Sequence, residues 1–169
     1  MAGEAKRQAD EAIGPPAPLA DVSLPFGMAY LLRRLHRVFS RRLEAEAGRL
    51  GVTAQQWFFL RELYERDGQT QSELARALSI ERATATTALA GMERQGLVRR
   101  RTEARDRRKT LVFLTPRARA LQPELFACAE RVNAEALRGF APGEVDALRQ
   151  GALRMMTNLI TIETTGEQQ

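Results

Sequence analysis

The spacing of apolar residues along the chain predicts a protein built mainly from helices. Apolar positions recur at helical spacing in four long segments, and each segment is bounded by residues that start or stop helices. Gly51 ends the first, Asp67-Gly68 ends the second, and prolines open the last two. These signals predict helices over residues 26–50, 53–66, 115–138 and 141–163.

A shorter pattern between the second and third long helices predicts a helix-turn-helix. Thr70 and Glu73 have the spacing of a capping box, in which each side chain accepts a hydrogen bond from the other residue's backbone N–H. We expect a short helix from Thr70 to about residue 77, a turn over 78–80 and a second helix over 81–95. Gly96 then supplies a residue that tolerates positive φ at the helix end.

The next segment predicts a strongly basic β-hairpin. Apolar runs at 97–98 and 111–114 flank a polar tip, as expected for two antiparallel strands. Residues 94–117 hold eight Arg and one Lys against Glu103 and Asp106, a net charge of +7, whereas the whole chain carries +5. Such concentrated positive charge is typical of proteins that bind polyanions, although a solvated basic loop is the alternative. The order of elements predicts a winged helix-turn-helix.

The second helix of this motif has a composition suited to contact with DNA. Its first two turns contain Arg82, Thr84, Thr86 and Thr87, although threonine is a poor helix former. Hydroxyl groups can bond phosphates or base edges, and threonine methyls can meet the thymine methyl. The alternative is that these hydroxyls bond within their own helix.

The first helix and the last two lie outside the winged unit and have surplus apolar positions. Such helices must pack on each other or on a second copy, so we expect a two-fold dimer, with a monomeric helical cap as the alternative. A dimer would present two recognition helices to a palindromic site. The predicted organisation is a flexible arm (1–24), a dimerisation helix (25–50), the winged unit (51–115), C-terminal dimerisation helices (116–163) and a flexible tail (164–169).

Composition argues against catalytic, metal and membrane functions. The chain has one histidine, His36, one cysteine, Cys128, and no glycine-rich phosphate loop, so we expect no enzyme, metal or cofactor. Cys128 is expected to be a buried, inert thiol, because the sequence places no fixed cation beside it. No secretion signal and no run approaching ~18 apolar residues is present, so we expect a cytoplasmic protein that spans no membrane.

Several fragments in order resemble the MarR/SlyA family of transcription regulators from about residue 25 to 162. The matching fragments are Leu50-Gly51-Val52-Thr53 with Trp57, Ser72-Glu73-Leu74-Ala75, Glu93-Arg94-Gln95-Gly96-Leu97-Val98 with Arg100, Asp106-Arg107-Arg108 and Leu114-Thr115. The resemblance implies a dimer formed by the terminal helices, a recognition helix in the major groove and a wing in the minor groove. It also implies a ligand-responsive regulator, usually one that is released from DNA.

The wing residues expected to meet DNA combine charge with this resemblance. By matched position, Arg108 would enter the minor groove and Asp106 would fix it, whereas a turn-forming role is the alternative for Asp106. A narrow minor groove concentrates negative potential and attracts arginine. The remaining wing residues expected at DNA are Arg100, Arg105, Arg107 and Lys109.

We also expect an effector site, in which a small aromatic acid or its coenzyme A thioester lowers the affinity for DNA. The candidate residues are Arg33, His36, Arg37, Trp57 and Phe58. Each has a simpler alternative: a solvated basic face for the arginines, a solvent-facing or core histidine, and core packing for the two aromatic residues. The alternative function for the whole chain is a winged-helix adaptor that binds protein or RNA without an effector.

Overall fold

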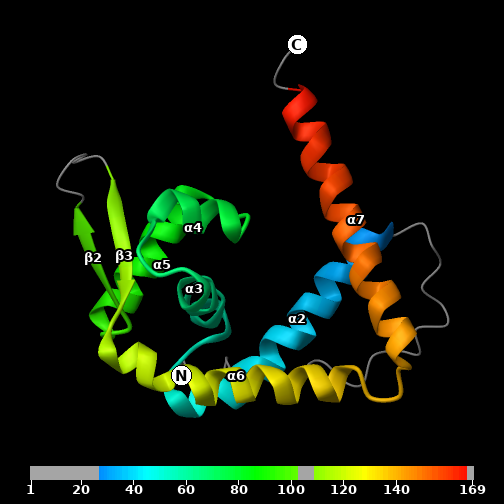
Figure 1. Cartoon of the computed structure of the whole chain (residues 1–169), viewed down its shortest axis with the longest axis horizontal. Helices are drawn as coiled ribbons and strands as arrows, with labels where there is room; N and C mark the ends of the chain where they lie inside the picture. The colour runs from blue at the N-terminus through cyan, green and yellow to red at the C-terminus, as the bar shows by residue number, and fades with distance from the viewer. Residues whose placement is uncertain (1–26, 103–108, 167–169) are drawn as a thin grey trace, which may run out of the picture. The chain divides into compact units, whose positions relative to one another are not determined.

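A computed structural model describes residues 27–102 and 109–166, with side-chain surroundings given as far as residue 160. The chain divides into two compact units, Met1–Phe39 and Ser40–Gln169, and the boundary falls within helix α2 (Gly27–Ala47). The elements that follow α2 all belong to the second unit (Figure 1). They are η3 (Gly48–Leu50), α3 (Ala54–Glu65), β1 (Gln69–Thr70), α4 (Gln71–Ala77), α5 (Arg82–Arg94), β2 (Val98–Thr102), β3 (Thr110–Leu114), α6 (Pro116–Ala136) and α7 (Pro142–Gly166).

The helix starts follow the local signals of the sequence. In α4 the Glu73 N–H donates to Thr70 Oγ1 at 3.1 Å, and the Thr70 N–H donates to Glu73 Oε2 at 2.7 Å, so the predicted capping box is confirmed. Helix α3 begins with the equivalent box of Thr53 and Gln56. The predicted arm, residues 1–24, lies outside the described residues, and the last turn of α7 lies within the segment predicted as a tail.

The sheet has one strand more than the sequence predicted. The hairpin of β2 and β3 is confirmed, with antiparallel pairs from Val98↔Leu114 to Thr102↔Thr110. Strand β1 pairs with the other edge of β3, which gives the order β1-β3-β2. The buried Gln69 side chain holds this short strand in place, because its amide donates to the carbonyls of Glu62 at 2.8 Å and Arg66 at 2.9 Å.

The core of the second unit lies between the helices and the hairpin. Leu60 of α3, Leu74 of α4, Leu89 of α5, Val112 of β3 and Leu125 of α6 are all fully buried. Each of these elements therefore contributes an apolar face to one cluster, and the hairpin lies beside α4 and α5 (Figure 1). This packing fixes the position of α5 relative to the wing.

Two helices keep large apolar side chains at the surface. In the first unit Met28, Leu31 and Leu35 of α2 are between 40 and 51% exposed. In α7, Met156 and Leu159 are 56 and 65% exposed, respectively. Among the described helices, none combines the length and apolar character needed to cross a membrane.

Candidate nucleic-acid interface

Helix α5 separates a buried face from an exposed polar face. Ala85, Leu89 and Met92, which recur at helical spacing, point into the core and are fully buried. On the other side Arg82, Thr84, Thr86 and Thr87 are all exposed. The helix therefore presents hydroxyls and a guanidinium to solvent over its first two turns.

Two of the threonine hydroxyls bond within the helix. Thr86 Oγ1 donates to the carbonyl of Arg82 at 2.9 Å, and Thr87 Oγ1 donates to the carbonyl of Ala83 at 3.1 Å. The alternative that the threonine hydroxyls bond within their own helix is therefore correct for Thr86 and Thr87, whose hydroxyl protons are donated to backbone carbonyls. Their oxygens can still accept hydrogen bonds.

The side chain of Arg82 is held against α4. Its Nε and Nη2 both donate to Ser72 Oγ, at 3.1 and 2.6 Å. Ser72 was not among the site residues predicted from the sequence. In the sequence, Ser72 stands between Thr70 and Glu73 of the capping box, ten residues before Arg82, and this position alone does not predict a contact with Arg82.

A hollow of about 550 Å³ opens where α4, α5 and the start of β3 meet. Its lining is polar and holds two cationic side chains. The lining residues are Thr70, Gln71, Ser72, Arg82, Thr86, Lys109 and Thr110. Because Arg82 comes from α5 and Lys109 precedes β3, the hollow joins the recognition helix to the wing.

The arginines of β2 lie on opposite faces of the strand. Arg99 and Arg101 are exposed, and the Arg99 guanidinium lies 5.7 Å from the centre of the Phe113 ring on the paired strand. Arg100 instead bonds Glu93 of α5: its N–H donates to Oε1 at 2.8 Å, and its Nη2 lies 2.7 Å from Oε2. These bonds lower the pKa of Glu93, the backbone N–H more than the guanidinium.

Arg100 thus ties the wing to α5. Its charge is paired with a carboxylate, unlike that of Arg101 or Lys109, for which the described residues include no such ion pair. We therefore propose a positioning role for Arg100, and its expected contact with DNA stays a prediction. The other wing residues expected at DNA, Arg105, Asp106, Arg107 and Arg108, lie outside the described residues, whereas Lys109 is described and exposed.

The residues proposed for an effector site fall into both units. Arg33, His36 and Arg37 are exposed on α2 in the first unit. Trp57 belongs to the core of the second unit, is only 4% exposed, and packs edge-on against Phe126 with ring centres 5.3 Å apart. Phe58 is partly buried against the same core, so packing accounts for both aromatic residues. Within the described ranges, no group of acidic, cysteine and histidine side chains is arranged to hold a metal ion.

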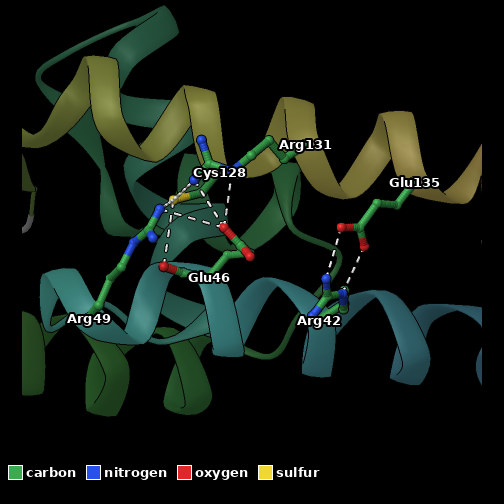
Figure 2. A network of polar contacts seen from close by, with 6 residues as sticks. All are labelled: Arg42, Glu46, Arg49, Cys128, Arg131 and Glu135. Atoms are coloured by element: carbon green, nitrogen blue, oxygen red, sulfur yellow. Dashed lines mark hydrogen bonds and ion pairs between the residues drawn. The ribbon is translucent and has the colours of Figure 1, made fainter.

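Cys128 of α6 is fully buried, as expected, but cations lie beside it (Figure 2). Arg131 Nη2 lies 3.3 Å and Arg49 Nη2 3.8 Å from its Sγ, and Sγ lies 3.6 Å from the carbonyl oxygen of Glu46. The expectation that no fixed cation lies beside the thiol is therefore wrong. The position of Arg131, one helical turn after Cys128, was the available signal, whereas Arg49 comes from a distant part of the sequence.

The geometry described so far defines a winged helix-turn-helix, and comparison with known proteins identifies its family. The MarR family model matches residues 52–110. A solved transcriptional regulator designated PA3341 is 34% identical, with a TM-score of 0.71, and the match covers 80% of this chain and 99% of that one. A MarR transcriptional regulator from Methanosarcina mazei Go1 is 24% identical, with a TM-score of 0.75, and 80 and 97% of the two chains are covered.

A MarR family regulator from Listeria monocytogenes, solved in complex with a 26mer DNA, is 25% identical with a TM-score of 0.74. That match covers 79% of this chain and 89% of the Listeria chain. The chain belongs to the MarR family of transcriptional regulators.

Proposed function

We propose that the protein is a dimeric repressor that binds double-stranded DNA at a palindromic operator. Helix α5 would enter the major groove and the β2–β3 hairpin the adjacent minor groove. The observation that carries the proposal is the exposed, hydroxyl-rich and basic face of α5 beside an arginine-rich hairpin. The DNA bound by the Listeria regulator supports the same use of this fold.

The dimer is supported by apolar side chains that the single chain leaves at its surface. Helix α7 keeps large apolar side chains exposed as far as residue 160, and the described part of α2 in the first unit does the same. Burial of such area stabilises an association by roughly 25 cal/mol per Å² before the entropic cost of binding is subtracted. A second copy of this chain is the partner that would cover these faces symmetrically.

Binding to the DNA that flanks the protein's own gene tests the proposal. The full chain should retard this duplex in a gel-shift assay, with an affinity on the order of 10⁻⁸ M or tighter and a steep loss with salt. A scrambled duplex should bind far more weakly, and a double-stranded RNA of the same sequence should not compete. Equal retention of the RNA, or no retention of either nucleic acid, would favour the adaptor function instead.

We further propose that a small aromatic acid or its coenzyme A thioester releases the DNA. The exposed Arg33 and Arg37 supply the positive charge that such an anion requires. A panel of aromatic acids and thioesters should yield at least one compound that raises the unfolding temperature and weakens the gel shift. A panel with no compound active in either assay would count against effector control.

A further inference from the structure

The polar hollow between α4, α5 and the wing has a geometry that the proposed DNA binding does not by itself explain. Arginine has five N–H donors, and two of those of Arg82 are used on Ser72 Oγ. These two, on Nε and Nη2, point to the same side of the guanidinium. Among the described residues, none accepts a bond from the terminal fork formed by Nη1 and the second N–H of Nη2, so this fork can bind a ligand.

Ser72 is suited to hold the guanidinium in this orientation. Its oxygen accepts both bonds from Arg82, which directs its own hydroxyl proton away from the arginine. Within the part of the chain that the structure describes, that proton is donated to no other group. The terminal N–H groups of Arg82 and the hydroxyl of Ser72 can therefore donate hydrogen bonds to an oxyanion. Arginine binds phosphate through two parallel N–H···O bonds.

The surrounding groups determine which oxyanion fits. Lys109 and Thr110 line the same hollow, and Lys109 adds a second positive charge. Glu73, the residue after Ser72, has its carboxylate already bonded to Thr70 and to Arg66. Among the described residues that line the hollow, two carry a positive charge and none carries a carboxylate, which favours a phosphate.

The position of the hollow between the two DNA-reading elements indicates the source of the phosphate. If α5 occupies the major groove and the hairpin the next minor groove, the strand that separates these grooves must pass between the two elements. The hollow lies at that junction, since its lining comes from α5 on one side and from the start of β3 on the other.

We propose that Ser72 is a positioning residue that holds Arg82 as a clamp on one backbone phosphodiester, the linkage between the two grooves occupied by each protomer. The inference rests on the proposed function and changes the role of one residue within it. Arg82 was expected to face the major groove together with the threonines of α5. In this arrangement it supplies affinity that is independent of sequence, and base recognition is left to the threonines of α5.

Uncharged phosphate analogues provide the direct test. A duplex that the full-length protein selects from a random library is synthesised with single methylphosphonate linkages, one position at a time in each half-site. Neutralising the clamped linkage should weaken wild-type binding, whereas the same duplex should bind Arg82→Ala no more weakly than the unmodified duplex does. The Arg82→Ala dimer should also lose about 1.8 from the slope of log affinity against log salt, about 0.9 for each copy.

Variants of Ser72 separate positioning from a purely structural role. Ser72→Ala removes both bonds that Arg82 donates to Ser72 Oγ, so it should weaken binding about tenfold or more and should flatten the methylphosphonate response. Ser72→Thr keeps the hydroxyl and should restore both. The wild-type protein, Ser72→Ala and Ser72→Thr should all have the same unfolding temperature. Arg61→Ala, which removes an exposed arginine of α3 outside the hollow, is the matched control for the loss of charge.

Three results would overturn the clamp. One is that Ser72→Ala binds like wild type, and a second is that no linkage loses its effect in Arg82→Ala. The third is that replacing guanines by 7-deazaguanine shows one base whose effect disappears in Arg82→Ala, because Arg82 would then bind a base edge. Failure of the wild-type protein to bind any duplex would instead overturn the proposed function, so the two failures are distinguishable.

Discussion

Among the described residues, Ser79 is the only one other than glycine with positive φ, +50°. It follows the end of α4, where the Ile80 N–H donates to the carbonyl of Ala75 at 2.9 Å and the Ser79 N–H to that of Arg76 at 3.1 Å. This is a Schellman motif, which usually places glycine at this position. Helix α5 ends in the same motif with Gly96, at φ +68°. The tight turn of the helix-turn-helix thus contains a side chain in a conformation that suits glycine.

We predict that Ser79→Gly stabilises the protein and that Gly96→Ser destabilises it. The left-handed conformation costs an L-residue about 1–2 kcal/mol, and the greater freedom of glycine in the unfolded chain offsets about half of that. Changes of about 0.5–1 kcal/mol in opposite directions are expected in urea denaturation. A Cβ at Gly96 has open space around it, so backbone conformation alone sets the cost. Changes of the same sign in the two variants would contradict this account.

Glu73 links the capping of α4 to pH. Hydrogen bonds from the backbone and hydroxyl of Thr70, and then from Arg66, lower the pKa of Glu73 from 4.5 to about 2. A carboxylate whose pKa is lower in the folded state stabilises the protein fully above pH 4.5, and this contribution is lost as the pH falls towards 2. Because the side chain is 39% exposed, solvent screening makes the gain smaller than the pKa change alone implies.

Replacement of Glu73 by Gln should therefore remove part of the acid sensitivity. Glutamine can keep the capping bond to Thr70 but carries no charge, so the loss of stability near neutral pH should be below about 1 kcal/mol. The free energy of unfolding, measured by denaturation from pH 7 to pH 2, should fall less steeply in the variant below pH 4.5. Parallel curves for the two proteins would show that Glu73 contributes nothing to the acid response.

At the scale of elements, the wing combines residues with different roles on one strand. Arg100 is paired with Glu93 and connects β2 to α5, whereas Arg99 and Arg101 face solvent. We predict that Arg100→Ala lowers the free energy of unfolding by up to about 1 kcal/mol, as expected for a partly exposed ion pair.

Arg108→Ala should leave the unfolding midpoint unchanged and weaken operator binding by about 1–3 kcal/mol.

Denaturation and fluorescence anisotropy on the same two variants check this division of roles. A fully stable Arg100→Ala variant would remove the positioning role proposed for that residue. A folded, dimeric Arg108→Ala protein with unchanged operator affinity and salt dependence would show that the wing tip is not a DNA-binding element.

The elements that the sequence predicted well are those specified by neighbouring residues. The capping boxes of Thr53 and Thr70 and the proline after Thr115 located three helix starts, because each signal lies within four residues of its partner. Strand β1 was missed because its two residues show no alternation and its pairing with Val112 is distant in sequence.

Side-chain partners were predicted less well than elements, for the same physical reason. The Arg82–Ser72 and Arg100–Glu93 contacts depend on how helices and strands pack, and not on spacing along one element. The exposed face of α5 followed from helical periodicity, whereas the hollow beside it required the packed structure. The ion pair of Arg100 with Glu93 is one contact that charge along the strand did not reveal, whereas the expected DNA contact of Arg100 stays a prediction.

At the scale of the molecule, the ion pairs join α2 to α6, whereas exposed apolar side chains lie on α7. Arg42 and Glu46 of α2 pair with Glu135 and Arg131 of α6, at 2.8 and 2.9 Å, within the second unit (Figure 2). Large apolar residues of α7 remain exposed, among them Leu148, Leu153, Met156 and Leu159. The pairs hold α6 to α2 within one chain, and the apolar residues are left for the proposed second copy.

Leu159→Arg tests the dimer that the proposed operator binding requires. Leu159 is 65% exposed in the single chain, so an arginine there should not disturb a folded monomer. In a dimer that buries this face the same change leaves an unpaired charge at the interface, at a cost of several kcal/mol. Sedimentation velocity at micromolar concentration should therefore show a dimer for the wild-type protein and a folded monomer for Leu159→Arg.

The matched control places the same charge on the other side of α7. Gln150 lies nine residues before Leu159, which is half a turn out of phase at 100° per residue, and it is also exposed. Gln150→Arg should remain dimeric and bind the operator like wild type. Leu159→Arg should lose most of its operator affinity. A dimer binds both half-sites of a palindrome with two linked recognition helices, whereas a monomer can occupy only one half-site. A dimeric Leu159→Arg protein would show that this face of α7 does not form the interface, and a monomeric wild-type protein would rule out the dimer itself.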